Sequence, residues 1–425
     1  MTGSEETQRA ALQSAPGEGA PWKLRFWSIF TGQALSLIGS ALTQFVLIWW
    51  ITDTTGSVSA LATAGLVALL PQALLGPLGG TFADRYNRRL LMIGADVISA
   101  LCMAVLILLF LTEQVTLWHV YTMMFIRSAM QAFQAPAAAA SVAMLVPASF
   151  LPRAAGLNQT LYGIMTIAAA PLGALAIAFM PIGFALGIDV FTALLGIVPL
   201  LLFRIPQPAR AAPHSNGLLG EFWQSVELVW NDPALLRLYA LLAASVVVIM
   251  PTFTLVPLLV KSHFGGGAAD VALVEAVGGV GMVAGGLIVT AVAPKRLVSW
   301  ILWGFAISCL TIGLFAAVPG NHFWAAVVFW GLSGLTFIMG NAPFTTLIQT
   351  SVPNEIQGRV LALLGTIMAL AAPIGLVLVT PLGEWMGVRW LFVAMGVAGA
   401  LVSFAGFLSS VLRKLDAQQK AAAQA

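Results

Sequence analysis

The chain has 425 residues, a formal net charge of +3 and a very apolar composition, with 60% hydrophobic and 8% charged residues. Ordinary soluble domains are roughly a quarter charged. So few charged side chains cannot cover the surface of the soluble domains that a chain of this length would form, which excludes a water-soluble fold. The basic residues are scattered singly, without the basic stripe or arm of a nucleic-acid-binding protein.

Runs of about 20 apolar residues, the length that crosses a bilayer as a helix, predict twelve membrane spans. A polar cytoplasmic N-terminus (1–21) precedes a six-helix bundle (22–204). A cytoplasmic linker with an amphipathic segment (205–237), a second six-helix bundle (238–412) and a cytoplasmic tail (413–425) follow. The spans are expected at 26–51, 58–80, 90–111, 117–137, 156–180, 183–203, 238–260, 271–292, 297–318, 323–344, 360–381 and 388–412.

The basic residues predict how the chain is oriented, because lysine and arginine are retained on the cytoplasmic side of short loops. With twelve spans, only Lys261 and Arg389 fall on the outer side and only Arg127 falls within a span. All other basic residues then share one side. We expect a multi-pass protein of the cell membrane with both termini in the cytoplasm.

The two halves of the chain carry a repeat. Pro136 and Pro147, which surround the end of span four, recur six spans later as Pro343 and Pro353. Parallel repeats of six spans are an arrangement of transporters, with the substrate path at the repeat interface. The expected fold class is an all-α membrane protein with twelve transmembrane helices in two pseudo-symmetric six-helix bundles.

Two loop sequences resemble signatures of a known family. Residues 80–89 (GTFADRYNRR) resemble the pattern G-x-x-x-D-R-x-G-R-R of the major facilitator superfamily, with Asn87 where the family prefers glycine. Asn tolerates the left-handed conformation better than most residues. Residues 349–360 look like the loop before span eleven in the macrolide-efflux type of drug:proton antiporter. The resemblance covers essentially the whole chain and implies the major facilitator fold and secondary active transport.

These loops predict a conformational latch. Asp84 is expected to face the start of span eleven, where free backbone N–H groups and the helix dipole favour an anion by ~0.3–1 kcal/mol. The neighbouring arginines are expected to pair with Asp96 or Glu355 and to separate when the halves rock apart; alternatively, they only set the topology. The predicted latch comprises Gly80, Asp84, Arg85, Arg88, Arg89, Asp96, Glu355, Gly358 and Arg359.

Ionisable residues within the spans are candidates for proton coupling. Arg127 lies ~15 Å from the outer end of span four, where a charge costs at least ~2.5 kcal/mol, so it should face the bundle interior. Gln44 and helix carbonyls are its expected partners, and the family pattern associates an arginine of span four with proton coupling. Asp96, Asp189 and Glu275 are candidate protonatable acids, unless they lie near water or cap helices. Glu275 is preferred because no base adjoins it.

A drug-like substrate requires a largely apolar cavity with a few polar anchors. Span one presents several polar side chains at helical spacing, which is typical of one wet helix face. Any single aromatic residue is more often packed in the core or against lipid than in contact with substrate. The cavity candidates are Gln33, Ser40, Gln44, Gln131, Tyr162, Phe253, Phe337 and Phe344.

The chain contains no nucleotide-binding G-x-x-x-x-G-K-[ST] loop and no cluster of metal ligands. We therefore expect no cofactor, no ATP site in this chain and a proton gradient as the energy source. The leading hypothesis is proton-coupled efflux of amphipathic, drug-like or macrolide-like molecules by a monomer whose partners are the bilayer and its substrate. The alternatives are an exporter of an endogenous metabolite such as a siderophore and a membrane scaffold or receptor. An enzyme is not expected.

Overall fold

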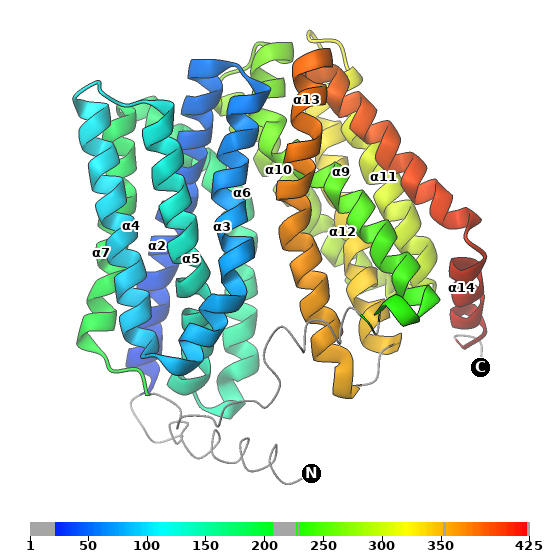
Figure 1. Ribbon diagram of the computed structural model, residues 1–425, viewed down its shortest axis with the longest axis horizontal. Coiled ribbons are helices and arrows are strands. Elements are labelled where there is room, and N and C mark those ends of the chain that lie inside the picture. Colours follow the sequence, from blue (N-terminus) through cyan, green and yellow to red (C-terminus); the bar gives the residue numbers. More distant parts are fainter. Residues whose placement is uncertain (1–21, 207–226, 228, 352–353, 423–425) are drawn as a thin grey trace. The chain divides into compact units, whose positions relative to one another are not determined.

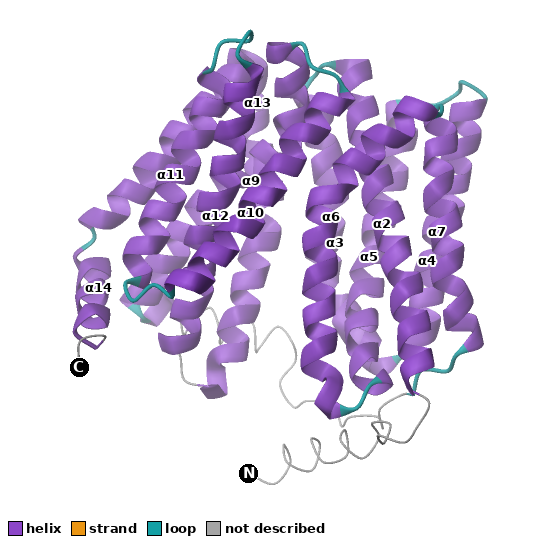
Figure 2. Cartoon of the chain, turned by 180° about the vertical axis from the view of Figure 1, so that it is seen from behind, coloured by secondary structure: helices purple, strands orange, loops and turns teal. Residues whose placement is uncertain are grey.

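The computed structural model describes residues 22–206, 227, 229–351 and 354–422, and all regular elements in this part of the chain are helices (Figures 1 and 2). This confirms the all-α membrane class. The polar N-terminus and most of the linker lie outside the described residues. The elements are α2 (Trp22–Thr55), α3 (Val58–Arg85), α4 (Arg88–Leu111), α5 (Leu117–Leu145), η1 (Ala148–Phe150), α6 (Leu151–Phe179), α7 (Ile182–Leu202), α9 (Pro233–Phe264), α10 (Ala268–Val292), α11 (Leu297–Ala317), α12 (Phe323–Ser351), α13 (Asn354–Leu408) and α14 (Ser410–Ala422).

Within the described residues, 10 helices are long and apolar enough to cross a membrane, whereas the sequence predicts twelve spans. Two helices account for the difference. Helix α13 counts once although it covers the last two predicted spans, and Gly387 interrupts it with φ of 80°. Glycine adopts this left-handed backbone without steric cost. Helix α5, which contains Arg127, is not among the 10.

The first of two compact units contains Met1–Trp50 and Val67–Pro213. Within it, α4 packs against both α5 and α7. Apolar side chains of α2, α4 and α7 and of the residues that follow α5 form a buried cluster that includes Phe26, Met92, Val146 and Leu200. This packing fixes the relative positions of the helices that carry most of the candidate site.

The second unit contains Ile51–Leu66 and His214–Ala425. Within it, α11 packs against α12 and α13, and α10 packs against α12. Close contacts of Gly396 and Gly399 with α11 involve the second half of α13. The packing of spans three, four and six in the first unit is thus repeated by spans nine, ten and twelve, as expected for two related halves.

Polar contacts hold the segment Ile51–Leu66 within the second unit. Lys261 Nζ lies 2.7 Å from Asp53 Oδ1. Glu384 Oε1 accepts hydrogen bonds from Ser57 Oγ at 3.3 Å and from the backbone N–H of Ser59 at 2.8 Å. The connection between α2 and α3 is therefore tied to α9 and α13.

Arg389 caps the C-terminal end of α11. Arg389 donates from Nε to the carbonyl of Ala316 and from Nη2 to that of Ala317, both at 3.2 Å. The last carbonyls of a helix have no partner within the helix, and the planar guanidinium offers donors in a fork that reaches two of them. Arg389 thereby links α13 to the C-terminal end of α11.

Candidate functional site: polar networks and a pocket in the first unit

The predicted latch loop forms the end of α3 and the start of α4. Arg88 Nη2 lies 3.4 Å from Asp84 Oδ1, and the same guanidinium donates to the carbonyls of Ala83 and Ala140 at 3.0 Å. Arg88 therefore joins α3, α4 and α5. The carboxylate of Asp84 remains 73% exposed, which leaves it available to a second partner.

Arg89 caps the C-terminal end of α7. It donates from Nη2 to the carbonyl of Leu201 at 2.7 Å and from Nε to the carbonyl of Leu200. The expected pairing of these arginines with Asp96 is not formed, because Asp96 lies about two turns further along α4 and binds Gln33 instead. In this structure Arg88 and Arg89 thus bind helices of their own unit.

The remaining latch residues have different environments. A Cβ at Gly80 would meet open space, whereas one at Gly79 would overlap the carbonyl oxygen of Ala132. The close helix approach therefore requires Gly79. Arg85 is exposed. Three predicted members lie in the first turns of α13, where side chains are outside the described residues: Glu355, Gly358 and Arg359.

Asn87 has another role than the one expected. Its φ is −66° and its ψ is 109°, an extended conformation, and its side chain accepts hydrogen bonds from the backbone N–H groups of Arg89 and Leu90. Asn87 is therefore the N-cap of α4. A side chain at this position typically stabilises a helix by ~1 kcal/mol, which explains why asparagine serves here without a left-handed backbone.

A buried ion pair joins α5 to α7. Arg127 Nη2 lies 3.0 Å from Asp189 Oδ2, and the two side chains are 12% and 5% exposed. Ser40 of α2 donates to Asp189 Oδ1 at 2.7 Å. Both oxygens of the carboxylate are thus engaged. Nη1 of Arg127 is buried and has no hydrogen-bond partner among the described residues.

The sequence does not indicate this pair. It predicts Gln44 and helix carbonyls as partners of Arg127 and gives Asp189 only as a separate protonatable acid. Both charged residues lie about two to three turns from the start of their helices, at similar depths if α5 and α7 enter the membrane from the same side. Matching the depths of opposite charges would have indicated the pair.

A second network consists of amide side chains around Asp96. Gln131 Nε2 donates to Gln134 Oε1 at 3.5 Å, Gln134 Nε2 donates to Gln33 Oε1 at 2.6 Å, and Gln33 Nε2 donates to Asp96 Oδ2 at 3.1 Å. The chain of hydrogen bonds connects α5 through α2 to α4. Gln134, which sequence reasoning missed, lies one helical turn from the predicted Gln131.

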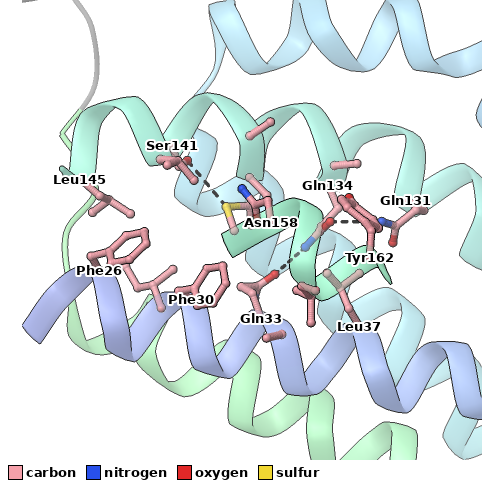
Figure 3. A pocket seen from close by; sticks show the side chains of 18 residues that line it. Phe26, Phe30, Gln33, Leu37, Gln131, Gln134, Ser141, Leu145, Asn158 and Tyr162 are labelled. Atoms are coloured by element: carbon pink, nitrogen blue, oxygen red, sulfur yellow. Dashed lines mark hydrogen bonds between the residues drawn. The ribbon is translucent and has the colours of Figure 1, made fainter. Parts of the chain in front are cut away.

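The amide network borders a pocket of about 170 Å³ (Figure 3). Phe26 and Phe30 lie at one end, whereas Gln33, Gln134 and Gln131 lie toward the other. The predicted cavity residues Gln33, Gln131 and Tyr162 all contribute. The pocket is lined by Phe26, Ile29, Phe30, Gln33, Ala34, Leu37, Met92, Gln131, Gln134, Ala135, Ala138, Ala139, Ser141, Val142, Leu145, Asn158, Leu161 and Tyr162.

Other cavity candidates are not among the residues that line this pocket. Phe337 and Phe344 are 6% and 1% exposed in the second unit. The ring of Phe253 lies 5.3 Å from that of Trp330 and 6.4 Å from that of Phe337, so these side chains form an aromatic core. Gln44 is partly buried on α2 and does not line the pocket.

The structure combines apolar helix bundles, a buried ion pair within the helices and an apolar pocket with polar groups at one end. These features are expected of a membrane transporter. The family model of the Major Facilitator Superfamily matches residues 29–376. The chain belongs to this superfamily. The transporter function and the membrane environment that the sequence predicts are confirmed by this membership.

Known relatives extend over almost the whole chain. Macrolide efflux protein A of Streptococcus pyogenes is 32% identical over 400 residues, which cover 93% of this chain and 98% of that protein. The protein of the same name from Enterococcus faecalis is 31% identical over 316 residues, or 73% of this chain and 97% of its own. A crystal structure of a bacterial homologue of the human lysosomal transporter Spinster aligns with a TM-score of 0.69 at 15% identity, covers 94% of this chain and 99% of its own, and shows the shared fold.

Proposed function

We propose that this transporter exports amphipathic small molecules of the drug or macrolide type by alternating access, driven by the proton gradient. The main observation behind the proposal is the pocket of the first unit. Its walls are apolar and aromatic and bear a few uncharged polar groups, which suits an amphipathic molecule. The near full-length similarity to proteins named for macrolide efflux supports the same substrate class.

The proposal places the protein in the cell membrane with both termini in the cytoplasm. Its support is the distribution of basic residues, of which only Lys261 and Arg389 are expected on the outer side. We further propose that the chain works as a monomer without a bound cofactor, ATP or an enzymatic step. Its partners are then the lipid bilayer and the transported molecule.

Proton coupling is assigned in this proposal to Arg127 and Asp189 in the first unit and to Glu275 in the second. Asp189 can exchange a proton only if its contacts with Arg127 and Ser40 change. Glu275 is partly buried within α10 and has no ion-pair or hydrogen-bond partner among the residues that the structure describes. A carboxyl group in such a position can take up and release a proton without first breaking an ion pair.

Everted membrane vesicles test the function directly. Vesicles that contain the protein and are energised by respiration should accumulate radiolabelled erythromycin, a macrolide, and a proton uncoupler should abolish the accumulation. Vesicles without the protein are the control. Accumulation that resists the uncoupler would contradict proton coupling, and its absence across a panel of macrolides and other amphipathic drugs would contradict the proposed substrate class.

Asp84→Asn tests the latch within the same assay. The substitution removes the charge of an exposed carboxylate that Arg88 holds at 3.4 Å. Because a latch depends on that charge, we expect uptake into vesicles to fall about tenfold or more. The amount of inserted protein should stay unchanged, because Arg88 keeps its hydrogen bonds to the carbonyls of Ala83 and Ala140 and an ion pair with a solvent-exposed carboxylate contributes only about 0–1 kcal/mol to stability. Normal turnover of a normally inserted variant would remove Asp84 from the transport cycle.

A further inference from the structure

The polar end of the pocket in the first unit offers amides and no charge. Gln33, Gln131, Gln134 and Asn158 line it, and the set of lining residues contains no acidic or basic side chain. Its volume of about 170 Å³ is below the roughly 300–1,000 Å³ of sites for whole drug-sized ligands. The pocket therefore has room for one ring or branch of an amphipathic molecule.

An acidic side chain lies directly behind one of these amides. Gln33 Nε2 donates to Asp96 Oδ2 at 3.1 Å and to the carbonyl of Gly196 at 3.3 Å, whereas its oxygen accepts from Gln134. Asp96 itself does not line the pocket. The amide of Gln33 thus stands between the carboxylate and the space that a ligand would occupy.

The surrounding backbone is fitted to this amide. A Cβ at Gly196 would lie 3.2 Å from Gln33 Nε2 and 3.1 Å from Ser36 Cβ, both tighter than ordinary contacts. Glycine at this position lets α7 approach α2 closely enough for its carbonyl to accept from Gln33. The side chain of Gln33 is held by three partners and is 8% exposed, so its position is well determined.

We propose that this pocket is a subsite for an uncharged, hydroxyl-bearing ring of the substrate, and that Gln33 sets this preference by masking Asp96. The inference rests on the proposed export of amphipathic molecules and specifies which part of the molecule this unit recognises. Amide groups satisfy hydroxyls as donors and as acceptors. A cation in the same pocket lacks a direct counter-charge, and transferring an unpaired charge from water into apolar surroundings is costly.

Removing the side chain of Gln33, which covers Asp96, should change the preference of the pocket from neutral to cationic ligands. In Gln33→Ala the carboxylate of Asp96 faces the pocket and attracts a cation. Ligand-observed NMR titrations of the purified protein in nanodiscs should use phenyl β-D-glucoside as the neutral probe and benzyltrimethylammonium as the cationic probe. The wild type should bind the glucoside more tightly, and Gln33→Ala should bind the cation at least about tenfold more tightly than the wild type does.

Two variants control for the cause of the switch. In Gln33→Ala combined with Asp96→Asn, the gain in cation affinity should disappear, because no carboxylate is uncovered. Asn158→Ala removes an amide of the same pocket and keeps the three partners of Gln33 in place, so it should weaken glucoside binding and leave cation binding as in the wild type. If Gln33→Ala does not fold, Gln33→Ser tests the same uncovering with a smaller change in volume.

The outcomes separate this inference from the proposed function. A wild type that binds neither probe, or a folded Gln33 variant without the gain for the cation, would overturn the subsite even if vesicles export macrolides. Conversely, a clear switch in probe preference together with absent macrolide export would support the subsite and count against the proposed substrate class.

Discussion

Replacing Arg127 with leucine is expected to reduce transport to the background of vesicles without the protein and to destabilise the first unit. The substitution leaves Asp189, which is 5% exposed, without its charge partner. Breaking a buried ion pair from one side typically costs about 3–5 kcal/mol. Thermal unfolding of the purified protein and macrolide uptake into everted vesicles measure the two effects.

A double substitution separates structure from mechanism. Arg127→Leu combined with Asp189→Leu removes both charges, and apolar replacement of a buried pair is often neutral for stability. We expect the double variant to regain thermal stability but not transport. It lacks the carboxylate that would bind a proton and the guanidinium that would respond to it. Recovery of transport together with stability would show that the pair serves folding alone.

Replacing Gly285 with alanine is expected to cost about 1–3 kcal/mol of stability, because α10 and α12 have no room for a side chain there. A Cβ at Gly285 would overlap the carbonyl oxygen of Leu335, and one at Gly281 would overlap that of Gly331. Backbone atoms of a packed helix cannot move aside as a flexible side chain can. Thermal unfolding in detergent and the yield of folded protein report the loss.

The neighbouring glycine offers a matched control for this substitution. A Cβ at Gly286 would meet only Ile338 Cγ2 at 3.8 Å, an ordinary van der Waals contact. Since alanine favours a helix over glycine by up to ~1 kcal/mol, Gly286→Ala should leave stability unchanged or raise it. Equal unfolding temperatures for Gly285→Ala and Gly286→Ala would contradict the close packing of α10 on α12.

Hydropathy was sufficient to predict the class and most helices, because a bilayer imposes the length and composition of each span. The sequence also predicted the two spans that a strict apolar criterion does not count separately. Helix α5 contains Arg127 and falls outside the apolar set, yet it is a continuous helix. Helix α13 covers two predicted spans, and the predicted break between them, 382–387, contains Glu384 and ends at Gly387, where the backbone is not helical.

The candidate site was harder to predict, because its contacts join residues from separate helices. The polar face of span one indicated Gln33 and Ser40, which the structure places in two polar networks, but it did not indicate that they bind Asp96 and Asp189. Those pairings depend on how the helices rotate and pack, which no single span encodes. Gln134 could have been found by its one-turn spacing from Gln131.

The hydrogen bonds of Lys261 and Arg389 bear on experiments that map membrane topology. Lys261 contacts the carboxylate of Asp53, and Arg389 binds carbonyls that would otherwise lack donors. These contacts form only in the folded chain, whereas basic residues set the topology while the chain is being inserted. Mapping by reporter fusions should therefore count both residues when the loops are assigned to sides.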